Sequence, residues 1–113
     1  MLPREHRLRL HGDFAHLWRF GREARVDGLR VRWGRSRTRK TRVGIVIARR
    51  AEKLATRRNR IRRVIREAMR PLIPGFRSPT DIVFMATPGM KAQSVAELRH
   101  RLELLFSRFH LLH

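Results

Sequence analysis

The side chains that most often carry out catalysis are scarce in this chain and poorly spaced for it. Six histidines are present and cysteine is absent, which excludes disulfides, thiolate zinc sites and thiol nucleophiles. His6, His11 and His16 are five residues apart, and on a helix this spacing turns successive side chains by about 140°, too far for one metal-binding face. The carboxylates are isolated, and Asp13 and Glu97 fit helix caps. The sequence therefore predicts neither a catalytic residue nor a metal site within the protein.

One short segment does have the residue types that bind phosphate. Five arginines surround Asn59 and Ile61 within seven consecutive residues: Arg57, Arg58, Arg60, Arg62 and Arg63. Guanidinium groups grip phosphate bidentately, and the N-terminus of a helix favours an anion further. The Asn59 amide can hydrogen-bond a base edge, a ribose 2′-hydroxyl or a neighbouring backbone group. The alternative interpretation is a solvated basic face with Asn59 as a local cap.

The positive charge of the chain is concentrated around that segment. The 113 residues include 28 Lys or Arg and nine Asp or Glu, a net charge of +19. Residues 25–70 hold sixteen arginines and two lysines against Asp27, Glu52 and Glu67, which leaves a net charge of +15. Such a surface repels itself unless a polyanion neutralises it, and nucleic acid is the partner we expect. An anionic membrane is the competing partner, but it favours aromatic anchors and the basic segment has none.

A short helix is expected over residues 13–21. Three apolar side chains at helical spacing share one face of it: Phe14, Leu17 and Trp18. Asp13 or Gly12 can cap its start, and Gly21 can end it in the left-handed conformation.

Three further segments fit strands. Residues 29–33 alternate apolar and basic side chains, and the basic residues 34–42 after them fit a hairpin loop. Residues 43–48 are apolar on both faces, which predicts a central strand. Residues 81–86 form another apolar run that ends in a turn.

A basic helix and a final helix complete the pattern. The core-facing positions of the helix over residues 54–70 are Ile61, Val64, Ile65, Ala68 and Leu72. Its opposite side carries Asn59, Arg62, Arg63, Arg66 and Arg70. Pro71 and Pro74 end it, and Ser94 with Glu97 forms a capping box for the last helix.

The order of these elements predicts the fold class. A helix, two or three strands, the basic helix, a strand and a helix favour an α+β domain, with helices packed on one small sheet. A chain of 113 residues supports one core, so we expect a single domain, residues 1–113. No apolar run approaches the roughly 20 residues that span a bilayer. The first residues lack the apolar core of a secretory signal, so we expect a cytoplasmic protein without a membrane partner.

The arginine segment and its surroundings also match a known signature. The residues concerned are Ala48, Arg49, Arg50, Ala55 and the run 58–67, RNRIRRVIRE. They resemble the bacterial ribonuclease P protein component, in which a small residue and two lysines precede an RNR-x-KR-x-x-RE helix. Further similar segments span most of the chain: residues 3–8, Asp13-Phe14 with Trp18, residues 42–45 and residues 81–83.

This resemblance implies a fold and a function. The fold is a four-stranded sheet with three helices in the order α-β-β-β-α-β-α, like domain 2 of ribosomal protein S5. Its β-α-β crossover through the basic helix is left-handed, against the usual rule. The function is that of the protein subunit of ribonuclease P, one protein with one catalytic RNA. It binds that RNA and the 5′ leader of precursor tRNA, while the RNA holds the Mg²⁺ ions and removes the leader.

The resemblance also implies roles for particular residues. Those that would bind the catalytic RNA are Arg49, Arg50, Arg57, Arg58, Asn59, Arg60, Arg62 and Arg63. Those that would bind the leader are Phe14, Trp18, Arg32, Arg62 and Arg66. Phe14 and Trp18 would form an aromatic floor on which any base can stack; ordinary core packing is the alternative for both.

Three departures from the family pattern bear on these roles. Lysines of the family are replaced here by Arg49, Arg50 and Arg62, which keeps the charge but changes the hydrogen-bonding geometry. The chain has no tyrosine, and a strand position that is often aromatic in the family is Arg32. The spacing from Arg50 to Arg58 resembles only some members. Because Arg32 stands where the family is often aromatic, we expect a leader site that is more electrostatic than stacked.

Other functions remain open from the sequence. A ribosomal or other structural RNA-binding protein would have the same charge and size. A DNA-binding regulator would need a helix-turn-helix pair, which the strands on either side of the basic helix disfavour. A protein nuclease would need the carboxylate cluster that this chain lacks.

Overall fold

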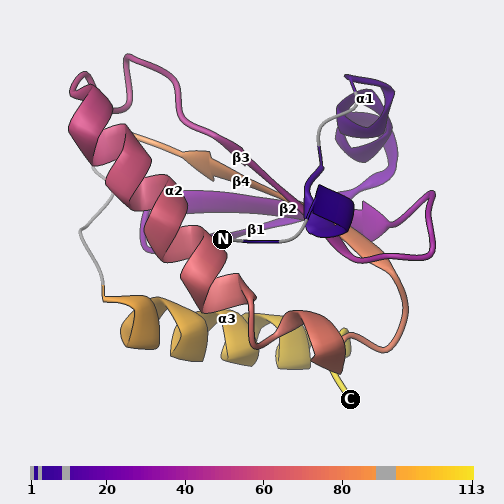
Figure 1. Cartoon of the computed structure of the whole chain (residues 1–113). Coiled ribbons are helices and arrows are strands. Elements are labelled where there is room, and N and C mark those ends of the chain that lie inside the picture. Colours follow the sequence, from indigo (N-terminus) through magenta and orange to yellow (C-terminus); the bar gives the residue numbers. More distant parts are fainter. Residues whose placement is uncertain (1, 3, 9–10, 89–93) are drawn as a thin grey trace.

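The computed structural model describes residues 2, 4–8, 11–88 and 94–113, and its centre is a four-stranded sheet (Figure 1). The helices and strands are α1 (His11–Phe20), β1 (Arg22–Val26), β2 (Leu29–Arg35), β3 (Arg42–Val46), α2 (Ala55–Met69), β4 (Thr80–Ala86) and α3 (Val95–Arg108). Short 3₁₀ turns stand at Arg4–His6 and Ile73–Gly75. The predicted α+β class, with three helices on a four-stranded sheet, is confirmed.

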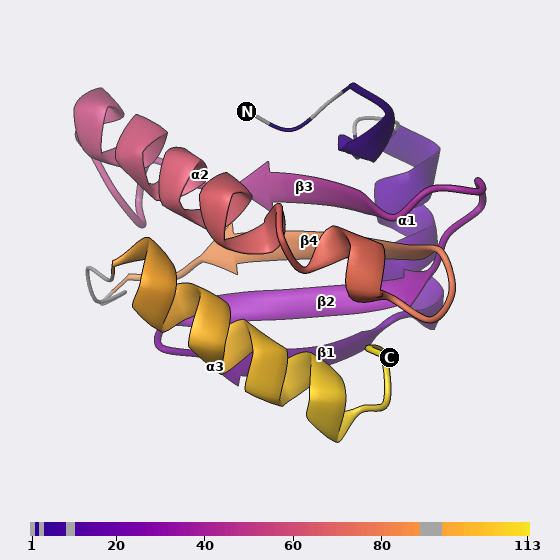
Figure 2. The ribbon, with the colours of Figure 1, turned by 60° about the horizontal axis from the view of Figure 1, so that its bottom comes forward.

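The strand order is β1-β2-β4-β3. β1 pairs with β2 and β2 with β4 in antiparallel fashion, whereas β3 and β4 are parallel neighbours. The chain passes from β3 to β4 through α2, on the face of the sheet that α2 and α3 cover (Figure 2). Seen with α2 in front, this crossover is left-handed, as the resemblance implies.

The order of the strands corrects two predictions. Residues 34–42 do not form a hairpin loop, because β4 lies between β2 and β3. Nor is β3 central: it is an edge strand, and β2 and β4 are the two inner strands. β3 is nevertheless apolar on both faces, because both are covered at Val43 and Gly44. Val43 belongs to the main core, and on the other face Phe14 and Leu8 approach Gly44 so closely that a Cβ there would lie 3.0 Å from the phenyl ring.

The first residues of the chain protect the exposed edge of β3. The backbone N–H of Leu8 donates to the carbonyl of Val43 at 2.9 Å, and Arg7 pairs with Val43 in a parallel bridge. The edge that β3 presents is therefore partly occupied from within the chain.

No residue pattern within Arg22–Val26 predicts the strand β1. It is joined to β2 by a two-residue turn in which Asp27 and Gly28 have φ values of 48° and 85°. Two successive positive φ angles are those of a type I′ turn, for which Asp-Gly is a preferred sequence. The hairpin follows from this dipeptide rather than from the periodicity of β1.

The ends of α1 differ from the prediction. The helix begins at His11, so Gly12 and Asp13 lie in its first turn rather than at its cap. Gly21 is absent from the described residues with positive φ, so it does not end the helix in the left-handed conformation. Its lack of a side chain matters for another reason. A Cβ at Gly21 would lie 2.6 Å from the carbonyl oxygen of Leu17 and 2.9 Å from that of Trp33.

Two apolar clusters hold the layers together. The main core lies between the sheet and α2 with α3, and it includes Ile65 and Ala68 of the predicted α2 stripe and Leu102 of α3. A smaller cluster on the opposite face packs α1 against β4, where Leu17 meets Val83 and Met85. Successive side chains of β4 point to opposite faces of the sheet, so this strand contributes to both clusters.

The predicted cap of α3 is confirmed. The Ser94 hydroxyl accepts a hydrogen bond from the backbone N–H of Glu97 at 3.1 Å, as in a capping box.

Candidate nucleic-acid interface

The loop between β3 and α2 holds its arginines beside the start of the helix. The Ala48 carbonyl accepts hydrogen bonds from the backbone N–H groups of Ala51 at 2.9 Å and Glu52 at 3.2 Å. The Glu52 carboxylate in turn accepts from the N–H of Leu54 at 3.1 Å. This turn exposes Arg49 and Arg50 next to the N-terminus of α2.

The start of α2 is electropositive in three ways. Its N-cap residue, Leu54, provides no side-chain hydrogen bond, and the first turn contains no acidic residue. The N–H groups of a helix N-terminus carry partial positive charge. Arginines add to this charge instead of offsetting it, which destabilises the isolated helix and favours a bound anion.

Most of the residues expected to bind the catalytic RNA are exposed around this terminus. The exposed members are Arg49, Arg50, Arg57, Asn59, Arg60 and Arg63. Within the described part of the chain, none of these five arginines forms an ion pair with a carboxylate. Their guanidinium groups are therefore available to an external anion.

The two remaining members are half-buried and already have partners. One guanidinium nitrogen of Arg58 donates to the backbone carbonyls of Glu52 at 3.0 Å and Lys53 at 2.9 Å. Arg58 thus ties the loop to α2. Arg62 reaches the side-chain oxygen of Asn59 at 3.5 Å, one helical turn away. This contact leaves the Asn59 amide NH₂ group free to donate to a ligand.

A second candidate surface is the face of the sheet opposite α2 and α3. We call it the open face, and define it by the outward residues of β1, β2 and β3 beside α1. They are Glu23, Arg25, Arg30, Arg32 and Val46. Val46 is 45% exposed, and Trp18 of α1, at the border of this face, is 48% exposed.

Trp18 rests against two arginines of β2. The guanidinium carbons of Arg30 and Arg32 lie 5.8 Å and 5.3 Å from the centre of its ring, within the range of cation–π attraction. Arg30 is also held by the Glu23 carboxylate at 2.9 Å. The indole is thus supported from within the protein while nearly half of its surface remains accessible.

Arg32 has a structural role that the sequence did not indicate. It donates to the backbone carbonyls of Leu17 at 2.5 Å and Trp18 at 2.6 Å, and so satisfies acceptors in the last turn of α1. Its side chain is only 17% exposed. Of the two arginines, Arg30 is the more exposed, and the alternation of residues 29–33 could have identified it because it lies on the same face.

Phe14 and Trp18 differ in their surroundings. Phe14 is half-buried and packs against the smaller cluster under α1, so core packing accounts for much of its surface. Trp18 belongs to no core cluster. Arg62 and Arg66 are half-buried on α2, which packs on the other face of the sheet from α1. The five residues expected at the leader therefore come from opposite sides of the sheet.

The described residues offer no metal site. No group of three or more His, Cys, Asp or Glu side chains in this part of the chain could hold a metal ion.

None of the helices in the described ranges is long and apolar enough to cross a membrane.

Comparisons with known proteins give consistent similarities. The family model described as Ribonuclease P matches residues 2–110. The Ribonuclease P protein component of a Pseudanabaena species is 32% identical over 114 residues, which cover 100% of this chain and 98% of the relative. That of Synechococcus elongatus is 33% identical over 117 residues, which cover 99% and 96%.

Two solved structures are similar to this fold. The RNase P protein from Thermotoga maritima has a TM-score of 0.74 and 27% identity, covering 90% of this chain and 96% of that one. The RNase P protein of Staphylococcus aureus has a TM-score of 0.78 at 20% identity, covering 96% and 98%, a likeness of fold.

Proposed function

Because this chain belongs to the ribonuclease P protein family, we propose that it is the protein subunit of a cytoplasmic ribonuclease P, one protein bound to one catalytic RNA. In this role it binds that RNA and the 5′ leader of precursor tRNA, and so assists removal of the leader. The observation that carries the proposal is the group of exposed, unpaired arginines at the N-terminus of α2, on the fold of this family.

The catalytic RNA would dock on the turn at Arg49 and Arg50 and on the start of α2. The exposed guanidinium groups of Arg57, Arg60 and Arg63 would grip phosphates. The Asn59 NH₂ group would donate to a base edge or a 2′-hydroxyl. Arg58 and Arg62 would act chiefly by holding the loop and Asn59 in place, since both have partners within the protein.

The leader would lie across the open face. Trp18 would stack on a leader base of any identity, because every base has a π face. Arg30 and Arg32 beneath the indole would add positive potential for the leader phosphates. Arg62 and Arg66 lie on α2, on the other side of the sheet, and would contact the leader where it leaves the open face.

The protein would leave bond cleavage to its RNA partner. The described residues provide no donor set for Mg²⁺, so we assign the ions to the RNA and no chemical step to the protein. The contribution of the chain is to bind, orient and neutralise. Its charge would offset the repulsion between two RNA molecules, an effect that matters most when divalent cations are scarce.

The proposal is tested by reconstitution. The purified protein is added to a bacterial ribonuclease P RNA at low Mg²⁺, and cleavage of the 5′ leader from a precursor tRNA is measured. We expect the protein to raise the cleavage rate. Replacing Arg60 and Arg63 together by alanine should weaken binding to the RNA by about 10-fold or more, since hydrogen bonds to charged groups contribute about 1.5–3 kcal/mol each.

A matched control removes the same charge elsewhere. The double variant Arg99→Ala/Arg108→Ala alters two exposed arginines of α3 and should bind and activate nearly as the parent does. If the protein adds nothing to leader cleavage and instead cosediments with ribosomal subunits, it is a ribosomal or other structural RNA-binding protein and the proposal is wrong.

A further inference from the structure

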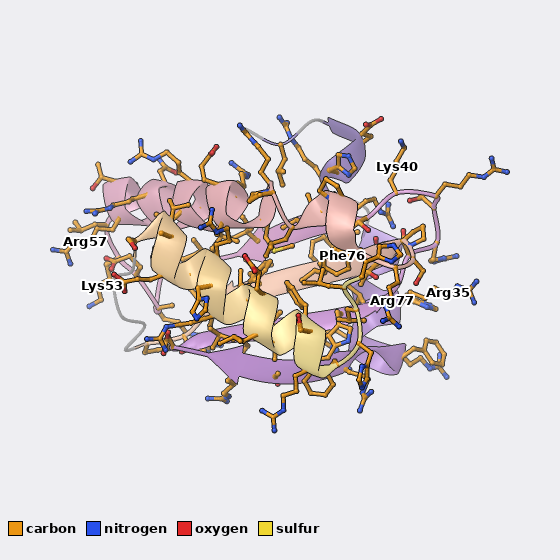
Figure 3. All side chains as sticks on the ribbon, turned by 90° about the horizontal axis from the view of Figure 1, so that it is seen from below. Arg35, Lys40, Lys53, Arg57, Phe76 and Arg77 are labelled. Carbon is orange, nitrogen blue, oxygen red and sulfur yellow. The ribbon has the colours of Figure 1, made fainter. Side chains whose placement is uncertain are left out.

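A second basic region lies at the end of the sheet remote from the start of α2. The segment 36–41 connects β2 to β3 there, and residues 76–79 lead into β4 beside it. Figure 3 shows Arg35, Lys40 and Arg77 at this end, and Lys53 and Arg57 at the opposite end. We call the first group the far end; its cations are Arg35, Arg37, Arg39, Lys40 and Arg77.

The far end is almost without counter-charge. Among the described residues, one carboxylate approaches these five cations: Glu5, which lies 4.0 Å from the Lys40 amine and is itself exposed. The nearby Asp81 is buried and bound bidentately by Arg42, at 2.9 and 2.7 Å. Five exposed cations therefore face solvent around a single weak ion pair.

The loop that carries most of these cations is held in one shape by hydroxyl groups. The Ser36 hydroxyl accepts from the backbone N–H of Thr38 at 3.1 Å, and the Thr38 hydroxyl accepts from that of Lys40 at 3.2 Å. The backbone N–H of Ser36 donates to the Pro79 carbonyl at 3.0 Å, which joins the loop to the segment before β4. A loop fixed before binding loses less conformational entropy when it binds.

A cavity of about 360 Å³ opens between the two segments. Its lining includes three cations, Arg39, Lys40 and Arg77, together with His6 and Ser78. It also includes the apolar residues Ile73, Pro74 and Phe76. His6 is kept in position by a 2.7 Å hydrogen bond between Nδ1 and the Thr41 carbonyl. A lining that combines cations with apolar side chains suits a group that is anionic at one end and flat and apolar at the other.

We propose that the far end is a second site for the ribonuclease P RNA, and that it holds an unpaired nucleotide. The phosphate of the nucleotide binds the cations that line the cavity, its base lies against the apolar lining residues, and Arg35 and Arg37 contact the neighbouring phosphates. The proposal rests on the proposed function for its partner, the ribonuclease P RNA. The longest dimension of the protein is 35 Å, so an RNA that reaches both ends must pass along the whole molecule.

The first test compares two double variants of equal charge. Arg37→Ala/Arg39→Ala should weaken binding to a bacterial ribonuclease P RNA by about 10-fold more than the α3 control Arg99→Ala/Arg108→Ala. The slope of log affinity against log salt should fall by up to about 2, since each lost phosphate contact removes about 0.9. Equal affinities and equal slopes for the two variants would overturn the proposal.

The second test uses the absence of cysteine in the chain. A single cysteine introduced as Arg37→Cys carries a photo-crosslinker, and Arg99→Cys on α3 serves as the control position. We expect the first to crosslink efficiently to unpaired nucleotides of the bound RNA and the second to crosslink weakly. Crosslinks from position 37 that are no stronger than the control, or that fall only in duplex, would contradict the site.

Parallel binding measurements distinguish failure of this proposal from failure of the proposed function. The α2 variant Arg60→Ala/Arg63→Ala is measured in parallel on the same RNA. A loss at α2 without a loss at the far end removes the second site and leaves the proposed function standing. Normal binding by both variants removes the proposed function as well.

Discussion

Arg42 and Asp81 form a buried ion pair that joins β3 to β4. Both side chains are less than a tenth exposed, and two hydrogen bonds link the guanidinium and the carboxylate. A buried charge is tolerated only when a partner offsets its lost hydration. The pair occupies matched positions in the parallel register, so it also specifies how the two strands align.

Removal of the carboxylate should destabilise the protein strongly. Asp81→Ala removes two hydrogen bonds and a buried counter-charge from the Arg42 guanidinium, and we expect a loss of about 3 kcal/mol in the free energy of unfolding. The midpoint of urea unfolding measures this change. Glu103→Ala, which removes the carboxylate of the exposed Arg99–Glu103 pair, should cost less than about 0.5 kcal/mol. Equal losses of unfolding free energy in the two variants would refute a stabilising role for the buried Arg42–Asp81 pair.

The helix α1 places a core residue and an exposed one side by side. Leu17 is 2% exposed under the helix, whereas its neighbour Trp18 is 48% exposed and rests on Arg30 and Arg32. The carbonyls of both residues accept hydrogen bonds from Arg32, so β2 fixes the end of the helix and the indole with it. We therefore expect a substitution at Leu17 to lower the stability of the fold and a substitution at Trp18 to weaken binding.

Trp18→Ala should weaken leader binding with little loss of stability. Removing a stacked indole costs about 1–3 kcal/mol per base, or about 5- to 150-fold in affinity. Affinity for a precursor tRNA should fall while affinity for the mature tRNA, which lacks the leader, stays the same. Leu17→Ala is the comparison, since it should reduce the free energy of unfolding by about 2–5 kcal/mol. Equal loss of precursor and mature tRNA binding by Trp18→Ala would argue against stacking on the leader.

Positive charge occupies both ends of the molecule. The start of α2 and the far end each carry exposed arginines, and the net charge of the chain is +19. Few carboxylates are available to offset this repulsion, so folding must work against it. A bound polyanion would relieve the repulsion at both ends at once.

Added salt should therefore raise the melting temperature of the free protein. Between about 0.01 M and about 0.15 M salt the Debye length falls from about 30 Å to about 8 Å, which screens repulsion between distant arginines. Thermal unfolding at several salt concentrations measures the effect. The rise should be smaller for Arg37→Ala/Arg39→Ala, because less repulsion remains to be screened. A melting temperature that falls with salt would mean that attractive ion pairs dominate.

Residue patterns in the sequence predicted the features of the fold that depend on residues close together along the chain. The stripe of α2 and the Ser94 cap of α3 follow from the spacing of neighbouring residues, and both are present. The helix ends before Gly21 as predicted, but the predicted left-handed conformation of Gly21 was wrong. A left-handed residue and a close approach both favour glycine, and the sequence does not distinguish them. The site residues stay predictions, although their exposure at the start of α2 agrees with them.

The sequence by itself determined a basic α+β chain, the two faces of α2 and the segment where its charge gathers. The tertiary structure alone decided that β4 separates β2 from β3, and that β3 is an edge strand covered on both faces at Val43 and Gly44. It also decided which arginines remain available, since Arg32 and Arg58 bind carbonyls of other segments. Periodicity records how a residue relates to its near neighbours, whereas strand order and side-chain partners depend on contacts between distant parts of the chain.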